Sequence, residues 1–364
     1  MAKAGLRYKR VNSVWGQLKL PKQGYRCTGC FYDERHFVER GMDESGVLPE
    51  ALRRAIKLVT KVDFAEGSEL LNDWGLALSK SSLERLSQCY GEEAWSQAQR
   101  SCQVLAKQAL PKAKRRETQS RRFVIEADGC FVLERDKAAT GGLEGREVKS
   151  LIIYPLTQPG KRVSLSSSVA IAEFRVLAQG LLRQAGICQG DICLGVGDGA
   201  PWVRELLEDL GVQHRLLDVF HAVSYLDTVL QTLRYSDAQR LEERKSWLKG
   251  EVDGAHWLQN TQALYNLSDE LRQTWSAEAQ TAWNYLQAHA QQGALAYPHF
   301  KDQGWVIGSG QIEGYNKWAI LERMRGSGMH WSKQGLKRMA FLRSDFASSK
   351  PLTEFHHVRR AAFP

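Results

Sequence analysis

Between residues 121 and 217, apolar stretches as long as β-strands alternate with amphipathic stretches as long as helices. The strand-like runs lie at 123–127, 148–156, 163–170, 192–196 and 213–217, and the helical runs at 173–184 and 201–210. The run at 192–196 is almost wholly apolar, which is typical of a strand with both faces buried. This alternation predicts an α/β fold, a mixed sheet with helices packed on it, in a domain that begins near residue 121.

The strand pattern is lost after residue 235. Residues 236–300 show amphipathic helical patterns only, and they carry four tryptophans that we expect to be buried anchors, Trp247, Trp257, Trp275 and Trp283. The sequence therefore predicts a first part of the sheet domain at 121–235, an all-helical insertion at 236–300, a last part of the sheet domain at 301–348 and a C-terminal tail at 349–364.

The pattern of residues 49–120 predicts helices and then, within the same range, a basic linker that includes residues 112–116. The pattern is helix, helix, a break near Gly75, and a further helix over 79–90 that Ser79 can cap. Lys80 and Arg85 lie on the exposed face of this last helix. A helix-turn-helix DNA-binding unit, which we favour, and a plain three-helix packing unit both fit this pattern.

Residues 1–48 are basic and contain two thiols at zinc-knuckle spacing, Cys27 and Cys30. His36 could add a third ligand, but no second Cys-x-x-Cys pair follows. We therefore favour free thiols in a remnant of a zinc ribbon over bound zinc. The seven cysteines of the chain, an odd number, do not indicate a disulfide framework.

The charge balance favours a polyanionic partner. The chain has 50 Lys and Arg against 41 Asp and Glu, a formal net charge of +9. No apolar run approaches the roughly 20 residues that a membrane span requires. We expect a cytoplasmic, nucleoid-associated protein that binds DNA, and no membrane partner.

Two acids follow directly on buried strand-like runs. Asp128 comes after 123–127, and Asp198 comes after 192–196 between two glycines. Burying a carboxylate at such a position costs on the order of several kcal/mol unless a cation or hydrogen bonds compensate it. An Asp-Gly turn is the alternative for Asp198 alone. Glu126 shares the strand face of Asp128, and strand parity does not separate these two acids.

A third acid, Glu313, opens a predicted helix after Gly308-Ser309-Gly310. Three hard oxygen donors suit Mg²⁺ or Mn²⁺, and sites of this kind hold two ions for in-line phosphoryl transfer. Lys317, Arg323 and Arg325 follow and are candidates for phosphate contacts. Trp331, after a glycine turn, is a candidate DNA contact, with packing against the sheet as the favoured alternative.

A fourth group lies where the run 213–217 gives way to a helix. Asp218 can cap that helix, which is the simpler interpretation of this residue. His221, one turn later, could contact a phosphate or orient a carboxylate. We treat the pair as supporting residues of the predicted site.

Taken in order, these motifs resemble the DDE transposases of bacterial insertion sequences, in particular the Kra-type and Lre-type groups. The resemblance covers about residues 120–345. The matching elements are Asp128-Gly129, Gly197-Asp198-Gly199-Ala200 with Trp202, Asp218-x-x-His221, Ile307-Gly308-Ser309-Gly310-x-Ile312-Glu313, Arg323, Gly328-Met329-x-Trp331 and Leu342-Arg343. The chain departs from this family in having one Cys-x-x-Cys pair where relatives have a fuller zinc ribbon.

The resemblance implies a ribonuclease-H-like fold with an all-helical insertion between the second and third acids. Its first strand would carry Asp128, its fourth strand would end at Asp198, and a late helix would carry Glu313. The implied activity is Mg²⁺-dependent cleavage and joining of DNA strands, by a homodimer or higher oligomer that pairs two element ends. The alternatives are a ribonuclease-H-like nuclease or resolvase that cuts without joining, and a transposase-derived DNA-binding protein.

Overall fold

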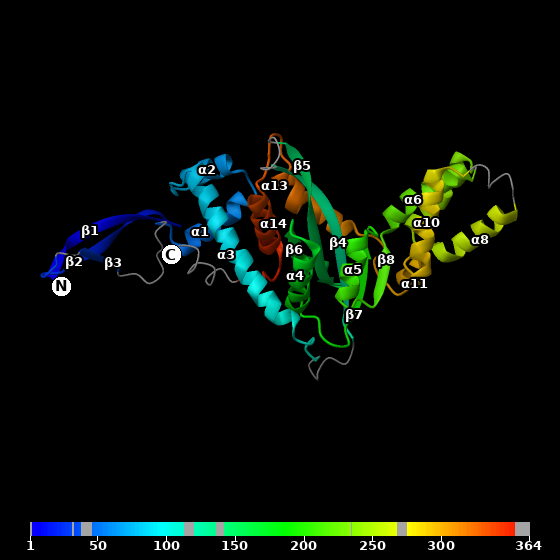
Figure 1. The fold of residues 1–364 in the computed structure, drawn as a ribbon, viewed down its shortest axis with the longest axis horizontal. Coiled ribbons are helices and arrows are strands. Elements are labelled where there is room, and N and C mark those ends of the chain that lie inside the picture. The colour runs from blue at the N-terminus through cyan, green and yellow to red at the C-terminus, as the bar shows by residue number, and fades with distance from the viewer. Residues whose placement is uncertain are drawn as a thin grey trace.

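The computed structural model describes residues 2–30, 33–37, 46–112, 120–135, 142–233, 235–267 and 275–353. The molecule is elongated, with a small N-terminal sheet at one end, a larger sheet in the middle and a helical region at the other end (Figure 1). Most of the basic run 112–116 and residues 354–364 of the tail lie outside the described residues, as does the side chain of His36. Among the described residues, none of the helices has the length and apolar character of a membrane span.

The central sheet is mixed and has five strands in the order β6-β5-β4-β7-β8. The first three in the chain pair antiparallel, and β7 and β8 join them in parallel. Their bounds are β4 (Arg122–Arg135), β5 (Leu143–Pro155), β6 (Val163–Ser167), β7 (Ile192–Gly197) and β8 (His214–Leu217). The predicted mixed α/β sheet is confirmed. β4 continues well past Asp128, where the sequence had predicted the apolar run to end.

Both faces of this sheet are buried at residues 123–127 and 193–197, which explains the apolar runs there, whereas the far end of β4 and the start of β5 are partly exposed. Phe123 and Ile125 of β4 pack on one face with helices α4 (Ile171–Gln184) and α5 (Pro201–Asp209). Val124 packs on the other face with α6 (Val219–Thr232). Helix α14 (Lys333–Ala347) contributes side chains to both cores. A strand enclosed in this way leaves an acid on it almost no contact with water.

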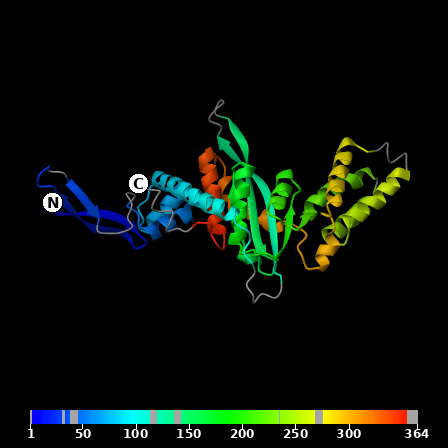
Figure 2. The same ribbon diagram turned by 60° about the horizontal axis from the view of Figure 1, so that its bottom comes forward.

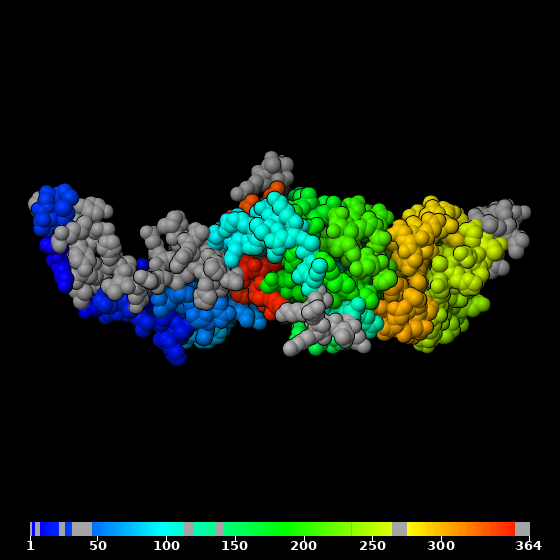
Figure 3. All heavy atoms as spheres, turned by 90° about the horizontal axis from the view of Figure 1, so that it is seen from below, coloured from blue at the N-terminus to red at the C-terminus, as the bar shows by residue number. Residues whose placement is uncertain are grey.

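The helical unit after residue 48 packs directly on the sheet domain. It comprises α1 (Pro49–Val59), α2 (Phe64–Asp73) and α3 (Lys80–Ala106). The Ser79 hydroxyl caps α3 by accepting a hydrogen bond from Ser82 N, as predicted. The helix runs to Ala106, far beyond the expected end at residue 90, because its second half packs against α4 and α14 (Figures 2 and 3). Use of this unit as a helix-turn-helix stays a prediction.

The N-terminal segment contains an antiparallel sheet that the sequence pattern did not predict. Its strands are β1 (Ala2–Ser13), β2 (Gly16–Arg26) and β3 (Asp33–Phe37). Ser13 pairs with Gly16 across a two-residue turn, and Gly16 has a φ of 95° that favours glycine. The many lysines and arginines hide the alternation of side chains that normally marks a strand. Cys27 and Cys30 follow β2.

The region after residue 235 is helical throughout its described parts, 235–267 and 275–302. It contains α7 (Asp237–Leu248), α8 (Gly254–Leu267), α10 (Ala277–Gln291) and α11 (Tyr297–Asp302). Trp247 and Trp283 are buried, whereas Trp257 and Trp275 are half-buried against the same core. The tryptophans therefore pack inside the molecule, as expected.

Candidate active site

Strand register brings the first two predicted acids together in the middle of the sheet, where β7 ends. Ala127 of β4 is the register partner of Gly197 of the parallel strand β7, so Asp128 and Asp198 come next on neighbouring strands. Burial raises the pKa of Asp128, and the charge of Asp198 adds to this effect, against a hydrogen bond from Asn316. Two neighbouring carboxylates favour a cation between them.

The segment after residue 309 forms one continuous helical stretch with an irregular middle. Helix α12 (Gly310–Tyr315) passes into a π-helical turn, η2 (Asn316–Leu321), and then into α13 (Glu322–Met324). π-helical turns are frequent at functional sites. Here the turn begins at Asn316, one helical turn after Glu313.

Two hydrogen bonds fix this helix to β4. Ile312 N donates to Glu126 Oε2 at 2.8 Å, and Asn316 Nδ2 donates to Asp128 Oδ2, also at 2.8 Å. Glu313 lies between these two contacts in sequence and has an exposed side chain. These two contacts hold the helical segment that carries Glu313 on the strand that carries Asp128, although the two acids are 185 positions apart in sequence.

The structure separates the roles of Glu126 and Asp128, which strand parity had left open. Glu126 is 0% exposed, and its carboxylate also accepts a hydrogen bond from the Tyr154 hydroxyl. Burial raises its pKa to about 7. Glu126 therefore holds the helix start, whereas Asp128 reaches the half-buried edge of the site.

Asp218 and His221 form a hydrogen-bonded pair at the start of α6. Asp218 Oδ2 accepts from His221 Nδ1 at 2.8 Å and from His221 N at 3.0 Å, and Asp218 Oδ1 accepts from Ser309 N at 2.7 Å. Burial opposes ionisation of Asp218, but these hydrogen bonds outweigh it and lower its pKa. The hydrogen bond to Asp218 raises the pKa of His221, and the charges of Asp198 and Asp128 add to this. The predicted helix cap is confirmed, and a role of the pair in a catalytic site stays a prediction.

One group among the described residues has the spacing of a metal site. Ligand atoms of Asp218, His221 and Glu313 all lie within 4.8 Å of one another, and this group could hold a metal ion. The predicted triad of Asp128, Asp198 and Glu313 does not form such a group among these residues. Both Asp218 oxygens already accept hydrogen bonds, which favours a positioning role for Asp218.

The residue that holds Asp128 has an amide oxygen without a partner. Asn316 is 3% exposed, and its Oδ1 atom has no hydrogen-bond partner among the described residues. A buried amide oxygen without a partner costs free energy unless a ligand reaches it. Amide and carboxylate oxygens are ligands that hard divalent cations prefer, although the group with metal-ligand spacing among the described residues is Asp218, His221 and Glu313.

The helical insertion supports the second acid. The Tyr285 hydroxyl of α10 donates to the backbone oxygen of Asp198 at 2.6 Å. Gly199 has a φ of 79°, and a Cβ there would collide with the Tyr285 hydroxyl and lie 2.8 Å from His289 Nε2. Asp198 Oδ1 accepts from Ala200 N at 2.9 Å, so the Asp-Gly turn considered above is also present.

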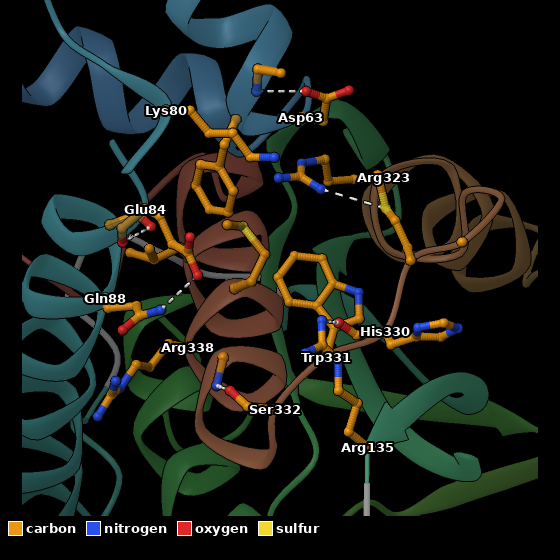
Figure 4. Close-up of a pocket in the computed structure, with 18 of the residues that line it drawn as sticks. Asp63, Lys80, Glu84, Gln88, Arg135, Arg323, His330, Trp331, Ser332 and Arg338 are labelled. Carbon is orange, nitrogen blue, oxygen red and sulfur yellow. Dashed lines mark hydrogen bonds between the residues drawn. The ribbon is translucent and has the colours of Figure 1, made fainter. Parts of the chain in front are cut away.

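The six residues proposed for DNA contact fall into two groups. Lys80, Arg323 and Trp331 line one pocket between the helical unit and the sheet domain (Figure 4). Arg323 is only 3% exposed and is therefore not on an open surface. The other three, Arg85, Lys317 and Arg325, are exposed and lie outside that pocket.

The thiols of Cys27 and Cys30 remain half of a metal site in the part of the chain that the structure describes. A hydrogen bond from the backbone N–H of Cys30 is the main cause that lowers the pKa of Cys27. No group of three potential ligands that includes them is found among the described residues.

Sequence reasoning assigned no role to Asn316, Ser309 or Tyr285, which all contact the site. Asn316 could have been noticed, because residues three apart on a helix share a face and Asn316 follows Glu313 at that spacing. Tyr285 carries no such signal, because the packing of α10 beside α6 places it near Asp198.

Comparison with known proteins gives little beyond this geometry. No family model matches the chain, and no curated protein matches it. Among solved structures, a chain of the Drosophila P element transposase strand transfer complex aligns with 12% identity over 89% of this chain and 85% of that chain, with a TM-score of 0.27. A similarity at this level supports no functional conclusion.

Proposed function

We propose that this protein is a metal-dependent DNA transposase of the DDE type, with a ribonuclease-H-like core in which Asp128, Asp198 and Glu313 are the catalytic acids. Two contacts carry this proposal: Asn316 with Asp128, and Ile312 with Glu126, which hold the Glu313 helix against the strand of the first acid. The order of the strands supports it, since β4 is the first and β7 the fourth of the central sheet along the chain.

The chemistry would be in-line displacement at a phosphodiester. Asp128, Asp198 and Glu313 would hold divalent cations, which would supply activation of the attacking oxygen and stabilisation of the leaving oxygen. The residues of the chain hold the donors in place: Asn316 orients Asp128, Ser309 Oγ donates to Glu313 Oε1 at 3.3 Å, and Tyr285 fixes the loop of Asp198. His221, oriented by Asp218, would contact a phosphate or a carboxylate of the site.

Exposed cations beside the site would hold the DNA backbone. Lys317 and Arg325 belong to the helical stretch that carries Glu313 or follow it directly, and Arg85 lies on the exposed face of α3. Contacts of this kind position a nucleic acid without reading its sequence. Because two element ends must be paired, we propose that the active form is a dimer or a higher oligomer.

The decisive test is the loss of metal-dependent cleavage on removal of one acid. Asp128→Asn, Asp198→Asn and Glu313→Gln should each abolish Mg²⁺-dependent nicking of DNA with candidate terminal repeats, while DNA binding is retained. Glu322→Gln is the matched control, because Glu322 is exposed on the same helical stretch. Retained nicking in all three acid variants would refute the assignment.

A second assay separates a transposase from a nuclease. Precleaved ends with a free 3′-hydroxyl are incubated with target DNA and Mg²⁺, and joined products are measured. Joining supports the transposase, whereas nicking without joining indicates a nuclease or resolvase of the same fold.

A further inference from the structure

A pocket lies at the seam between the helical unit and the sheet domain, and none of the three acids lines it. We call it the seam pocket. Its volume is about 520 Å³, within the range of about 300–1,000 Å³ that small-molecule sites occupy. Its walls come from the start of α2, one face of α3, the loop that ends at Trp331, and α14. Segments that are distant in sequence therefore meet around it (Figure 4).

One end of the seam pocket is cationic. Lys80, at the first position of α3, and Arg323, at the end of the Glu313 helix, point toward one another (Figure 4). The N-terminus of α3 adds the positive end of a long helix dipole to this place. Arg135 lines the pocket as well. Asp63 lines the same end and carries one negative charge. Three cations against one acid favour a further anion in this space.

Arg323 supplies the second and independent indication of a ligand. Its guanidinium lies between the rings of Phe64 and Trp331, with 5.4 Å and 5.3 Å to the ring centroids, and its Nε donates to Val59 O at 3.0 Å. The residue is 3% exposed, yet its Nη2 atom has no hydrogen-bond partner among the described residues. A buried cation with a free donor is costly, and an anionic oxygen would offset that cost.

The remainder of the pocket differs from the cationic end. Trp331, Met339 and Leu342 provide an apolar wall, and the last two are buried. Glu84 and Gln88, whose side chains are joined by a hydrogen bond of 3.3 Å, offer polar groups at the far side (Figure 4). These three parts match one nucleotide. The cationic end suits the phosphate, the apolar wall suits the sugar or the face of the base, and the polar far side suits the edge of the base.

We infer that the seam pocket binds one unpaired nucleotide of a DNA strand, with its phosphate between Lys80 and Arg323 and its base against Trp331. This inference rests on the proposed function for the choice of DNA as the ligand. A duplex is too wide for the pocket, so the strand enters it single. Binding there ties the helical unit to the sheet domain.

The test uses the full chain without metal, so that cleavage does not contribute. A fluorescein-labelled single-stranded thymidine oligonucleotide of about ten nucleotides is titrated by fluorescence anisotropy at several salt concentrations. Lys80→Ala and Arg135→Ala should each weaken binding about tenfold, as expected for one lost charge-assisted contact. Each should also reduce the slope of log affinity against log salt by about 0.7.

Lys61→Ala is the matched control, because Lys61 is an exposed lysine near α2 that does not line the pocket. It should leave both affinity and salt slope nearly unchanged. Amide hydrogen exchange gives an independent readout, since the oligonucleotide should slow exchange at the start of α3 and around Trp331. All three substituted residues are on the surface or at its edge, and thermal unfolding verifies that each variant is folded.

The outcomes separate this inference from the proposed function. If wild-type protein nicks DNA with Mg²⁺ but Lys80→Ala and Arg135→Ala bind like Lys61→Ala, the pocket is not a nucleotide site and the transposase proposal stands. If the acid variants keep nicking while the pocket variants lose binding, the catalytic assignment fails and the pocket stands. Wild-type protein that does not bind the oligonucleotide overturns the inference.

Discussion

Asn316 donates a hydrogen bond from Nδ2 to Oδ2 of Asp128 at 2.8 Å, across the face of the central sheet. The contact joins the π-helical turn after Glu313 to the strand that carries the first acid. It orients one Asp128 oxygen and leaves Asn316 Oδ1 without a hydrogen-bond partner among the described residues. The relative positions of the first and third acids thus depend on a residue that is not itself an acid.

Asn316→Ala should lower the apparent affinity for Mg²⁺ strongly and the free energy of unfolding only slightly. Loss of a residue that orients a metal ligand typically costs about 10–100-fold in metal affinity or activity. We expect the Mg²⁺ concentration for half-maximal nicking to rise about tenfold. Gln311→Ala, at an exposed position of the same helix, is the control. An unchanged Mg²⁺ titration in Asn316→Ala would assign Asn316 a packing role only.

Glu126 should tolerate loss of its charge but not loss of its oxygens. Glu126→Gln keeps an acceptor for Ile312 N and a polar partner for Tyr154, so the free energy of unfolding should change by less than about 1 kcal/mol. Glu126→Ala leaves Ile312 N unpaired in the core and should destabilise by about 1–3 kcal/mol, with a parallel loss of nicking. Urea unfolding measures the first quantity. Equal stability of the two variants would contradict this role.

Gly199→Ala should disturb the second acid through the helical insertion. A left-handed φ costs a non-glycine residue about 1–2 kcal/mol, and here the new Cβ would also displace Tyr285. Gly211 is a matched control, because its φ is 70° and a Cβ there would contact nothing within 4 Å. We expect Gly211→Ala to show the backbone cost alone.

Gly199→Ala should therefore be less stable than Gly211→Ala, and nicking should fall in Gly199→Ala only. Tyr285→Phe removes the hydrogen bond to Asp198 O without a steric change, and it should lower nicking with a small effect on thermal stability. Full activity of Tyr285→Phe would show that the insertion does not position Asp198.

The contribution of Asp345 to the free energy of unfolding should decrease as the pH rises. The carboxylate accepts hydrogen bonds from Leu352 N at 2.6 Å and from the Thr353 hydroxyl, but burial raises its pKa to about 6. An unfolded Asp has a pKa of about 3.9. Between these values the folded state binds more protons than the unfolded state, so the contribution is complete below about pH 4 and is lost as the pH rises through about 6.

The size of this contribution is on the order of 3 kcal/mol, from about two pKa units at 1.36 kcal/mol each. Asp345→Asn should lack it. The free energy of unfolding of wild type, relative to that of Asp345→Asn, should therefore be higher at about pH 4 than at about pH 7, as measured by urea unfolding. Asp302→Asn, at an exposed position, serves as the control. A pH-independent difference would refute the assignment.

The presence of the strands of the central sheet, though not their order, followed from the sequence. Strands buried on both faces must be apolar, and 123–127 and 192–196 show that composition without any knowledge of their partners. The acids after these runs were notable for the same reason, since an acid there needs compensation. The N-terminal sheet was missed, because its strands are rich in exposed charge and their pairing depends on a hairpin turn at Val14 and Trp15.

Long-range contacts account for what the sequence left open. Glu126 and Asp128 share a strand face, and only the arrival of Ile312 and Asn316 from the distant helix gives them different roles. The sequence predicts Lys80, Arg323 and Trp331 as separate DNA contacts. In the structure, the packing of α3 against α14 brings all three to the lining of one pocket.

The sequence by itself determined the class of fold, the helical insertion and the identity of the candidate acids, because burial and secondary-structure period are recorded in local composition. The tertiary structure decided which acid is a support, which residues orient the others, and where the cations converge. These features depend on side chains that approach through space, at a spacing that no local pattern encodes.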